Sequence, residues 1–352
     1  MRSKPLVAVD AAPAVRTQRT GTELVARELC CRLPEAAPDL RFDLYAPSGA
    51  DGLAVTVLPA TRLFSQLRLP IQLWRRRPDL LFAPAHVVPF LAPARAVTIV
   101  HDLAFERHPD AYPAKALRYL RLTTRWAERR CIALITPSEA TRRDLLELHG
   151  VDPRQVVTVH PGGGQPAPDL CDEEVRQRLH RLGVRGDFVL QVGRVEQKKN
   201  PAAALAAVRR LDGPSLVLVG ARADTALADR LEQDRRCLVL GQVGDLDRDA
   251  LYRGTLAVVM PSRYEGFGFP VLEALRRGVP VVASRTSSLP EVGGDAAAYV
   301  DDPDDSSSFA TTLARAIADR AERADRGRAQ AARFSWERCA AEVASVLRIA
   351  LS

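Results

Sequence analysis

One stretch of this sequence decides the fold: PSRYEGFGFPVLEA at residues 261–274. It follows an apolar run, Leu256–Met260, that is typical of a buried strand, and it leads into a predicted helix over Pro270–Arg277. A strand, a glycine-rich turn and a helix in this order are typical of parallel α/β sheets, where ligands bind beyond the carboxyl ends of the strands. We therefore expect an α/β protein with a ligand site at this turn.

Two carboxylates frame the turn. Glu265 precedes the glycines, and Glu273 lies eight positions later, inside the predicted helix. A carboxylate in the loop can bind sugar hydroxyls, and one on the helix can bind a ribose, as acidic residues do in nucleotide-binding folds. The alternative interpretation is a surface turn followed by a solvated helix charge. The backbone N–H groups of this turn suit a sugar or a phosphate, and they belong to Gly266, Phe267, Gly268 and Phe269.

A second stretch, GRVEQKKNP at residues 193–201, follows the predicted strand Phe188–Val192. Gly193 permits a tight turn, and Pro201 suits the first turn of a helix. Arg194 and Lys199 place a guanidinium and an ammonium beside a helix N-terminus, and this combination favours binding of a diphosphate. The alternative is a solvated basic loop.

Short apolar runs alternate with amphipathic segments, which predicts doubly wound parallel sheets covered by helices. The sequence PGGGQPAP, within His160–Pro168, resists helix and strand and is typical of a hinge. We therefore predict an N-terminal Rossmann-like acceptor domain over 1–163, a C-terminal Rossmann-like donor domain over 164–333, and a last helix over 334–352 that packs back on the first domain. The further predicted strands are Leu6–Val9, Asp43–Ala46, Leu80–Phe82, Val97–Val100, Ala133–Thr136, Val156–Val159, Ser215–Val219, Cys237–Leu240, Val279–Ala283 and Ala298–Val300, and the predicted helices include Glu23–Leu33, Ala114–Arg130, Ser138–His149, Pro201–Leu211, Thr225–Arg235 and Ser306–Ala332.

The composition is that of an ordinary globular protein. Of the 352 residues 47% are apolar, which is enough for two hydrophobic cores. No run approaches the roughly 20 uncharged apolar residues that span a bilayer, and no signal-peptide pattern is evident. Six scattered cysteines without metal-site spacing indicate a reducing compartment. We expect a cytoplasmic protein.

The net charge of +7 favours anionic partners such as phosphorylated small molecules, acidic lipids or nucleic acid. The segment Arg62–Arg77 mixes leucines and Trp74 with five arginines. Such a segment can lie peripherally on an anionic membrane, on its inner face, and present a site to a lipid-linked acceptor. The alternative is a helix whose apolar face is core and whose arginines are solvated, and Pro70 argues against one continuous helix.

The spacing of Glu265 and Glu273, together with GRVEQKKN upstream, resembles the retaining glycosyltransferases of family 4. The resemblance covers nearly the whole chain and implies the GT-B fold, two facing Rossmann-like domains with a cleft between them. It implies transfer of a sugar from a nucleotide-sugar donor to a glycan or lipid-linked acceptor, in cell-surface polysaccharide or glycolipid synthesis. The segment HDLAF at residues 101–105 resembles mannosyltransferase-like members and favours GDP-mannose, while UDP- and dTDP-sugars stay open.

The resemblance also implies residue roles. Arg194 and Lys199 would stabilise the departing diphosphate, Glu265 would contact the sugar hydroxyls, and Glu273 would hold the ribose. His101 would hydrogen-bond the transferred sugar. No nucleophile is evident for a covalent intermediate, so the resemblance implies retention by same-face attack of the acceptor.

Backbone positions complete the donor site that the resemblance implies. Gly193 and the turn 266–269 would meet the donor through their backbone. Gly21 stands in place of the family's glycine-rich loop, although the double glycine of many relatives is missing. Val243 lies in a stretch that resembles the one facing the nucleobase. The segments Ser287–Val292 and Phe334–Trp336 resemble a later turn and the closing signature of the family.

No cofactor is expected, and a metal is not expected either. Asp245-Leu246-Asp247 and Asp302-Pro303-Asp304 match the DxD pattern of metal-dependent transferases of another fold, but both fall in predicted loops. Two other classes of protein stay open as alternatives. A nucleotide-sugar 2-epimerase shares the two-domain architecture, and incubation of donor without acceptor distinguishes it. A nucleic-acid-binding protein fits the charge, but with 5% aromatic residues and no binding-module motif we expect no nucleic-acid partner.

Overall fold

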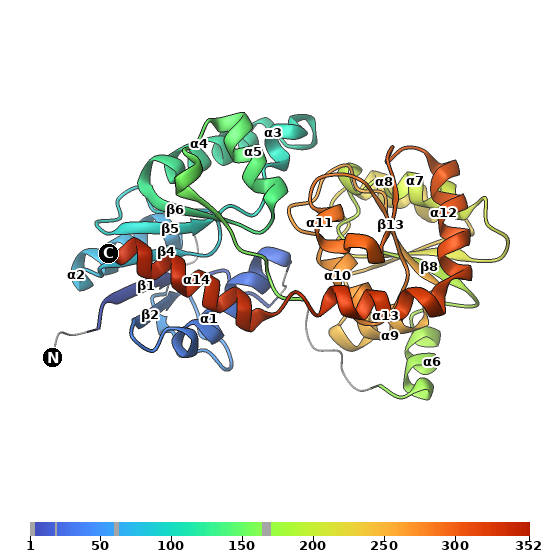
Figure 1. Ribbon diagram of the computed structural model, residues 1–352, viewed down its shortest axis with the longest axis horizontal. Helices are drawn as coiled ribbons and strands as arrows, with labels where there is room; N and C mark the ends of the chain where they lie inside the picture. The colour runs from blue at the N-terminus through green and yellow to red at the C-terminus, as the bar shows by residue number, and fades with distance from the viewer. Residues whose placement is uncertain (1–3, 18–19, 60–62, 164–169) are drawn as a thin grey trace. The chain divides into compact units, whose positions relative to one another are not determined.

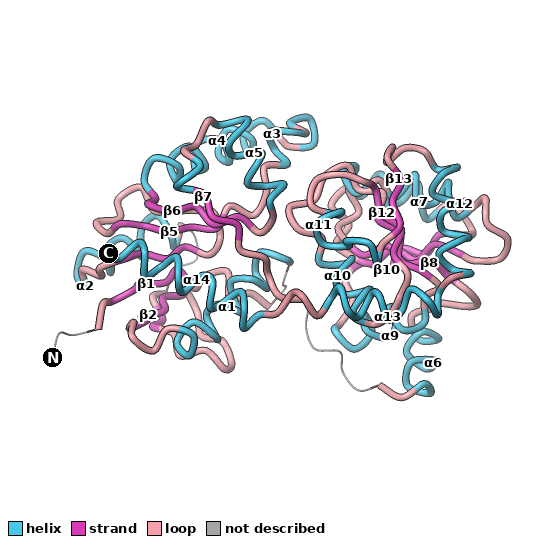
Figure 2. Tube along the Cα trace, in the orientation of Figure 1, coloured by secondary structure: helices cyan, strands magenta, loops and turns pink. Residues whose placement is uncertain are grey.

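The computed structural model of the protein describes residues 4–17, 20–59, 63–163 and 170–352 (Figure 1). The chain forms two compact units. Unit 1 consists of Met1–Gly162 and Phe334–Ser352, and unit 2 consists of Gly163–Arg333. Each unit contains a parallel sheet, magenta in Figure 2, with helices in cyan around it. The predicted α/β class is confirmed.

The sheet of unit 1 has the strand order β3-β2-β1-β4-β5-β6-β7, so the order reverses between β1 and β4. Neighbouring strands are parallel throughout, for example with Val7 opposite Phe42 on one side and Leu80 on the other. All five residues of β1 are buried, as expected for a strand covered on both faces. The strands are β1 (Leu6–Asp10), β2 (Arg41–Ala46), β3 (Thr56–Val57), β4 (Leu80–Ala83), β5 (Arg95–Ile99), β6 (Cys131–Thr136) and β7 (Val156–Thr158).

The helices of unit 1 have recognisable end signals. Ser138 accepts a hydrogen bond from the backbone N–H of Thr141 at 3.1 Å and so caps α5. The last helix, α14, packs beside α1 (Figure 1). A Cβ at Gly162 would clash with Trp336, so the chain passes this point because position 162 is glycine. The helices are α1 (Gly21–Ala36), α2 (Leu69–Arg76), α3 (Ala104–Arg107), α4 (Ala114–Arg130), α5 (Glu139–His149) and α14 (Trp336–Leu351), with shorter turns η1 (Phe64–Arg68), η2 (Pro109–Ala111) and η3 (Pro153–Gln155).

The sheet of unit 2 has the order β10-β9-β8-β11-β12-β13, and its order reverses between β8 and β11. These two strands are direct neighbours, with Val258 of β11 opposite Leu190 of β8. The reversal creates the position at which ligands bind in open α/β sheets. The strands are β8 (Phe188–Val192), β9 (Ser215–Val219), β10 (Cys237–Gly241), β11 (Ala257–Met260), β12 (Val281–Ser284) and β13 (Ala298–Val300).

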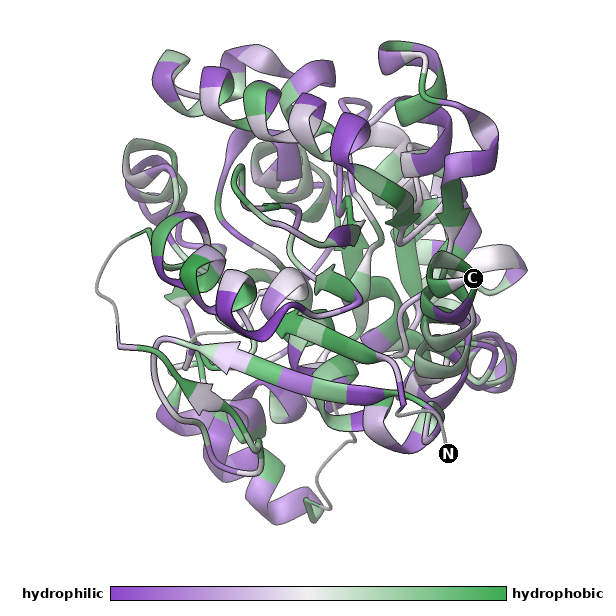
Figure 3. Ribbon diagram, turned by 90° about the vertical axis from the view of Figure 1, so that its left-hand side faces the viewer, coloured by the Kyte–Doolittle hydropathy of each residue, from purple (hydrophilic) through white to green (hydrophobic). Residues whose placement is uncertain are grey.

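The helices of this protein carry both apolar and polar residues, which Figure 3 draws as green and purple bands along the ribbons. In the helix Ser306–Ala318 one face packs on the sheet, where Phe309 and Leu313 are fully buried. The helices are α6 (Asp172–Arg181), α7 (Pro201–Val208), α8 (Thr225–Glu232), α9 (Asp245–Gly254), α10 (Phe269–Arg276), α11 (Leu289–Gly293), α12 (Ser306–Ala318) and α13 (Arg320–Ala331), with turns η4 (Gln197–Lys199) and η5 (Gly294–Ala296).

The structure corrects several local predictions. Asp245-Leu246-Asp247, predicted as a loop, begins α9, where acidic residues favour the first helical turn. The single helix predicted over Ser306–Ala332 is two helices that meet at Asp319. Pro70 agrees with its prediction, because the segment is not one continuous α-helix: η1 ends at Arg68, and α2 begins at Leu69 with Pro70 in its first turn, where its missing N–H costs nothing. The short strand β3 and the helix α6 were not predicted. Of the expected hinge, 164–168 lies outside the described residues.

Candidate active site

Two loops leave the neighbouring strands β8 and β11 at the point where the strand order of unit 2 reverses. Gly193 follows β8 with φ +148°, and its N–H donates to the carbonyl oxygen of Val219 at 2.8 Å. Gly220 follows β9 with φ +145°, and a Cβ there would clash with the carbonyl oxygen of Gly193. Glycine at both positions therefore lets the two turns approach each other. Sequence reasoning identified Gly193 but not Gly220.

Lys199 and Glu265 form an ion pair between these loops. The Lys199 Nζ donates to both carboxylate oxygens of Glu265, at 2.6 Å to Oε1 and 2.5 Å to Oε2. Their side chains are 16% and 8% exposed, so the pair is largely removed from water. Ser262 adds a hydroxyl donor to Oε1 at 2.8 Å. An ammonium and a carboxylate thus lie side by side beyond the carboxyl ends of β8 and β11, although the sequence assigned them to different parts of a ligand.

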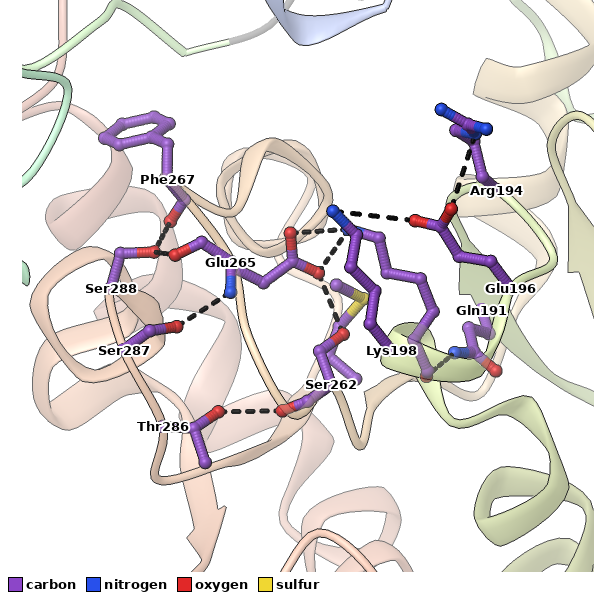
Figure 4. A network of polar contacts seen from close by, with 12 residues as sticks. Gln191, Arg194, Glu196, Lys198, Ser262, Glu265, Phe267, Thr286, Ser287 and Ser288 are labelled. Carbon is purple, nitrogen blue, oxygen red and sulfur yellow. Dashed lines mark hydrogen bonds and ion pairs between the residues drawn. The ribbon is translucent and has the colours of Figure 1, made fainter. Parts of the chain in front are cut away.

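Serine hydroxyls hold the loop that carries Glu265 (Figure 4). The N–H of Glu265 donates to Ser287 Oγ at 2.8 Å. Ser288 donates to the carbonyl oxygens of Glu265 and Phe267, at 2.9 and 2.7 Å. These contacts fix the direction of the carboxylate, because they hold the backbone on both sides of Glu265. Ser287 has φ +46°, a left-handed conformation that is rare for a residue other than glycine.

Arg194 does not share a partner with Lys199. Its side chain is 58% exposed, and its Nε lies 3.6 Å from Glu196 Oε2. Lys198 Nζ lies 3.7 Å from the other oxygen of Glu196, which therefore lies between Arg194 and Lys198 in Figure 4. The sequence predicted that Arg194 and Lys199 converge on a bound diphosphate, and this stays a prediction. In the structure each is held by a different glutamate.

Glu273 is buried in α10, and Tyr252 of α9 donates its hydroxyl to Glu273 Oε2 at 2.8 Å. The turn before α10 is glycine-dependent, because Gly268 has φ +108° and a Cβ there would lie 3.0 Å from Leu289 Cδ2. Within this turn Phe267 is buried, and its ring meets that of Phe269 edge-on at 5.0 Å. Gly266 is half-buried. Nothing in the sequence indicated that the hydroxyl of Tyr252 contacts Glu273.

Val243 lies beyond the carboxyl end of β10, the edge strand of the sheet, and is half-buried. Two strands, β9 and β8, separate β10 from β11. Val243, Lys199 and Glu265 therefore all follow the carboxyl ends of strands in the same sheet, but the strand before Val243 lies at the side of the sheet and not at its centre.

His101 and Gly21 belong to unit 1. His101 follows β5, and its Nε2 lies 2.7 Å from the carbonyl oxygen of Pro84. Burial lowers the pKa of this imidazole, so the ring is neutral at pH 7. Because a carbonyl oxygen accepts, Nε2 carries the proton and Nδ1 is left as an acceptor. Gly21 is the first residue of α1, next to Thr20, whose N–H donates to Glu23 Oε2 at 3.1 Å.

Asp10 is a buried carboxyl that the sequence pattern did not single out. It ends β1, at the reversal of the strand order in unit 1, and its Oδ1 accepts from the N–H of Ala12 at 3.1 Å. Burial raises the pKa of Asp10 to about 6, although hydrogen bonds from Ser65 and Ala12 and the nearby Arg16 act in the opposite direction. Its position directly after an apolar strand was the available signal.

The two DxD sequences are engaged by basic and backbone groups. Asp247 Oδ1 lies 2.7 Å from Arg178 Nη1, and Asp245 Oδ1 lies 3.0 Å from Arg248 Nη2. Asp304 Oδ1 accepts from Asn200 and Arg263, at 2.8 and 2.5 Å. Among the described residues, no group of three or more His, Cys, Asp or Glu side chains is arranged to hold a metal ion. In the same residues no helix is both long and apolar enough to cross a membrane.

Comparison with protein-family models matches both units. Residues 174–333 match the model described as glycosyl transferases group 1. Residues 19–162 match the model described as glycosyltransferase family 4. The two matches divide the chain at the same place as the two compact units.

Known proteins and solved structures agree with these matches. An O-antigen chain mannosyltransferase B of Escherichia coli is 31% identical over 272 residues, 72% of this chain and 70% of that protein. A D-inositol 3-phosphate glycosyltransferase of Mycobacterium tuberculosis is 30% identical over 166 residues, 45% of this chain and 35% of that protein. The crystal structure of Anabaena HepE with UDP and glucose superposes with a TM-score of 0.77 at 19% identity, covering 98% of this chain and 100% of that one. The crystal structure of WaaG, a glycosyltransferase involved in lipopolysaccharide biosynthesis, gives 0.74 at 15% identity, with 97% and 99% covered.

Proposed function

The chain belongs to the glycosyltransferases of group 1 and family 4 and has their GT-B fold, and from this membership we propose that it transfers mannose from GDP-mannose to a glycan or lipid-linked acceptor. The transfer retains the anomeric configuration and serves the synthesis of cell-surface polysaccharide or glycolipid. The observation that carries the proposal is the Lys199–Glu265 ion pair at the reversal of the strand order in unit 2.

The ion pair supplies both kinds of group that a nucleotide sugar needs. Lys199 carries a positive charge that stabilises the diphosphate as its negative charge develops. Glu265 accepts hydrogen bonds from the hydroxyls of the sugar. Because the two side chains already hold each other at 2.5–2.6 Å, neither has to be positioned when the donor binds. Arg194, which is 58% exposed, supplies the second cation by leaving its weak contact with Glu196.

Retention follows from same-face attack in this proposal. A covalent intermediate requires a nucleophile free to reach the sugar. Glu265 is engaged by Lys199 and Ser262, which suits a carboxylate that stabilises charge better than one that attacks. The departing diphosphate, held by Lys199 and Arg194, takes the proton of the acceptor hydroxyl. Proton NMR of the product, compared with that of the donor, gives the anomeric configuration, and an inverted product would overturn this step.

The choice of mannose rests on the Escherichia coli mannosyltransferase and on the HDLAF segment at 101–105. The Anabaena structure with UDP and glucose supports a nucleotide-sugar donor in general. A thermal-shift screen of GDP, UDP and dTDP identifies the base. A ligand at 100 times its dissociation constant stabilises the folded state by about 2.7 kcal/mol. GDP should give the largest rise in melting temperature, and a larger rise with UDP would replace the mannose proposal by a UDP-sugar.

Transfer itself is tested with GDP-mannose and a pool of lipid-linked or oligosaccharide acceptors, with release of GDP as the measurement. Donor incubated alone provides the control for an epimerase, which would change the sugar without any acceptor. The reaction needs no metal ion in this proposal, because Lys199 and Arg194 supply the positive charge. Transfer should therefore continue in EDTA, and loss of activity that returns with Mg²⁺ or Mn²⁺ would contradict this part.

We also propose that the protein is cytoplasmic and contacts an anionic membrane through η1 and α2 of unit 1. One face of this segment is core, with Phe64, Leu69 and Leu73 buried. A second apolar stripe at helical spacing faces outward, because Leu67, Ile71 and Trp74 are 57%, 50% and 59% exposed. The buried face agrees with the interpretation of this segment as core, and the exposed stripe supports the proposed membrane contact. Arg62, at its start, lies outside the described residues.

The charge around this stripe fits an anionic lipid surface. No aspartate or glutamate occurs between Leu53 and Pro78. Arg68, Arg75 and Arg77 are exposed, and in the described part of the chain they make no ion pair. The stripe extends to Leu91, 70% exposed, whose carbonyl oxygen accepts from the Trp74 indole at 3.0 Å. Exposed apolar groups flanked by arginines match the interface of an acidic membrane.

Vesicle co-sedimentation tests this contact, with vesicles containing phosphatidylglycerol compared with pure phosphatidylcholine. Replacing Arg68, Arg75 and Arg77 by glutamine should weaken binding about 100-fold, since each arginine near the surface contributes about 1 kcal/mol. Ile349→Ser, at another exposed apolar residue of unit 1, is the matched control and should bind as the parent protein does. Equal binding to both vesicle types would overturn the proposal. It would also be overturned if the protein formed a dimer through the stripe and did not bind vesicles.

A further inference from the structure

Tyr252 is the fully buried tyrosine whose hydroxyl meets Glu273. It lies on α9 with no exposed surface, and its Oη is 2.8 Å from Glu273 Oε2. Burial, followed by the neighbouring Glu273 charge, raises the pKa of Tyr252 well above its ordinary value. The phenol therefore stays protonated and donates, and Glu273 Oε2 accepts.

A set of contacts fixes the tyrosine ring. The Arg277 guanidinium carbon lies 5.0 Å above the ring centroid, within range of a cation–π interaction. Arg277 in turn donates to Asp249 Oδ1 at 2.7 Å and to the backbone carbonyl oxygen of Glu273 at 2.8 Å. The Asp249 side chain has no exposed surface. Ring, guanidinium and the backbone of residue 273 are thus held in one arrangement, which leaves the tyrosine hydroxyl a single direction.

The arrangement engages one carboxylate oxygen of Glu273. Oε2 accepts from Tyr252, whereas in the described residues no hydrogen bond is made to Oε1, and Oε1 is not among the fully buried side-chain atoms without a partner, so it keeps contact with solvent. An ionised carboxylate has about four acceptor positions, so a buried one with a single donor retains strong capacity for further donors. Neighbouring hydroxyl groups of a ribose are donors of the kind that such an oxygen accepts, whereas a phosphate oxygen would be repelled.

We propose that Tyr252 is a specificity-determining residue that holds Glu273 so that Oε1 accepts a hydrogen bond from a ribose hydroxyl, which makes the site selective for ribonucleotide over deoxyribonucleotide donors. The inference rests on the proposed function, because it takes a nucleotide sugar as the donor. Tyr252 acts through Glu273 and does not touch the nucleotide. It is a positioning residue, and its removal should affect the ribose hydroxyl contact and no other part of the ligand.

The experiment pairs a protein variant with a ligand variant. Isothermal titration calorimetry measures the dissociation constants of GDP and 2′,3′-dideoxy-GDP, or of the UDP pair if UDP binds more tightly, for the parent protein and for Tyr252→Phe. The parent should bind the dideoxy ligand about tenfold more weakly, because a hydrogen bond to a charged group is lost. Tyr252→Phe should bind the ribose ligand several-fold more weakly and the dideoxy ligand nearly as the parent does. The ratio of the dissociation constant of the dideoxy ligand to that of the ribose ligand should therefore fall to about two- to threefold.

The matched control is Tyr299→Phe. Tyr299 also lies under an arginine, with Arg285 5.0 Å from its ring centroid, but its hydroxyl donates to the backbone carbonyl oxygen of Gly294 at 2.9 Å. This variant loses a comparable hydrogen bond in the same unit and should keep the tenfold ratio. Donor KM should rise in Tyr252→Phe with kcat changed less.

The outcomes separate the inference from the proposed function. If the parent discriminates tenfold and Tyr252→Phe does so too, the tyrosine has a merely structural role and the inference is wrong while the proposed function stands. If the parent binds both ligands equally, the assignment of the ribose to Glu273 fails, and the inference fails with it. If Tyr252→Phe does not fold, Arg277→Lys replaces it, since it keeps a charge beside Asp249 and leaves Glu273 unchanged but removes the planar guanidinium that lies over the tyrosine ring. This variant should also lower the ratio, and an unchanged ratio would overturn the inference.

Discussion

Removing the Lys199 charge while keeping its stem tests the ion pair most directly. The stem packs near Gly193, where a Cβ would lie 3.7 Å from Lys199 Cε, so methionine preserves the packing and deletes the ammonium. Lys199→Met leaves Glu265 as a buried carboxylate with Ser262 as its remaining side-chain donor. Breaking a fully buried pair costs about 3–5 kcal/mol. Because the two side chains keep 16% and 8% exposure, we expect a loss of about 2 kcal/mol in the free energy of unfolding.

The second half of the cycle isolates the pairing. Glu265→Gln alone leaves Lys199 without its partner, and the double variant Lys199→Met/Glu265→Gln leaves no unpaired charge. In urea denaturation the free energy of unfolding of the double variant should lie within about 1 kcal/mol of that of the parent. The coupling energy between the two positions should be about 2 kcal/mol. Each single variant should lower kcat about 100- to 1,000-fold, the range seen when one charge-stabilising donor is removed.

Lys198→Met is the control for these measurements. Lys198 precedes Lys199 in the same loop, and its Nζ lies 3.7 Å from Glu196, a longer contact than the one at Glu265. It should keep most of the transfer rate and stability. Additive losses in the double variant, or full transfer activity in Lys199→Met, would refute the reasoning, because either result would mean that the pair is not a unit and does not act on the donor.

Three further outcomes are expected. Asp10→Asn should raise the free energy of unfolding above pH 7 by about 3 kcal/mol, because the pKa of Asp10 is about 6 in the folded protein against an ordinary value of 3.8, so folding favours the protonated carboxyl. The stability that protonated Asp10 contributes is fully present below pH 4 and is lost as the pH rises through 6. Urea titrations of both proteins should therefore show a gain for the variant at pH 8 and none at pH 4. Gly220→Ala should lower the melting temperature by several degrees and reduce activity, since a Cβ would clash with the Gly193 carbonyl; an alanine variant as stable and active as the parent would contradict the close approach. Ser288→Ala should cost about 1–3 kcal/mol, since two backbone carbonyl oxygens lose their donor, and Ser307→Ala, at an exposed helix start, should cost less in the same denaturation assay.

Much of the fold follows from local patterns. The predicted strands Phe188–Val192, Ser215–Val219 and Ala298–Val300 have the observed bounds, because buried parallel strands are short apolar runs bounded by polar or glycine residues. Helix α6 was missed for the opposite reason. In Asp172–Arg181 only Val175 and Leu179 are apolar, so the segment offers two apolar positions at helical spacing and little else to distinguish it from a solvated loop.

The candidate site was predictable as residues but not as contacts. Lys199 and Glu265 stand out in the sequence, yet they are 66 positions apart, and their pairing depends on the adjacency of β8 and β11. Sequence reasoning gave Arg194 and Lys199 one shared anion because they lie in one loop. In the structure Lys199 pairs with Glu265 and Arg194 lies near Glu196, and the first of these contacts joins two different loops. The hydroxyls of Ser287 and Ser288 reach across to another loop, for which no local pattern exists.

The return of the chain to unit 1 has a consequence for its biosynthesis. Helix α14 contributes Trp336, Val343 and Leu347 to the core of unit 1, beside α1, but it is translated after all of unit 2. During synthesis on the ribosome, unit 2 is contiguous and has its whole sheet available once residue 333 has emerged. Unit 1 must wait for its last helix, with the hydrophobic surface of α1 uncovered in the meantime. Ribosome-bound chains that end at residue 333, followed by a linker long enough to fill the exit tunnel, should therefore show unit 2 protected from proteolysis while unit 1 stays sensitive, a reversal of the usual N-terminal-first order.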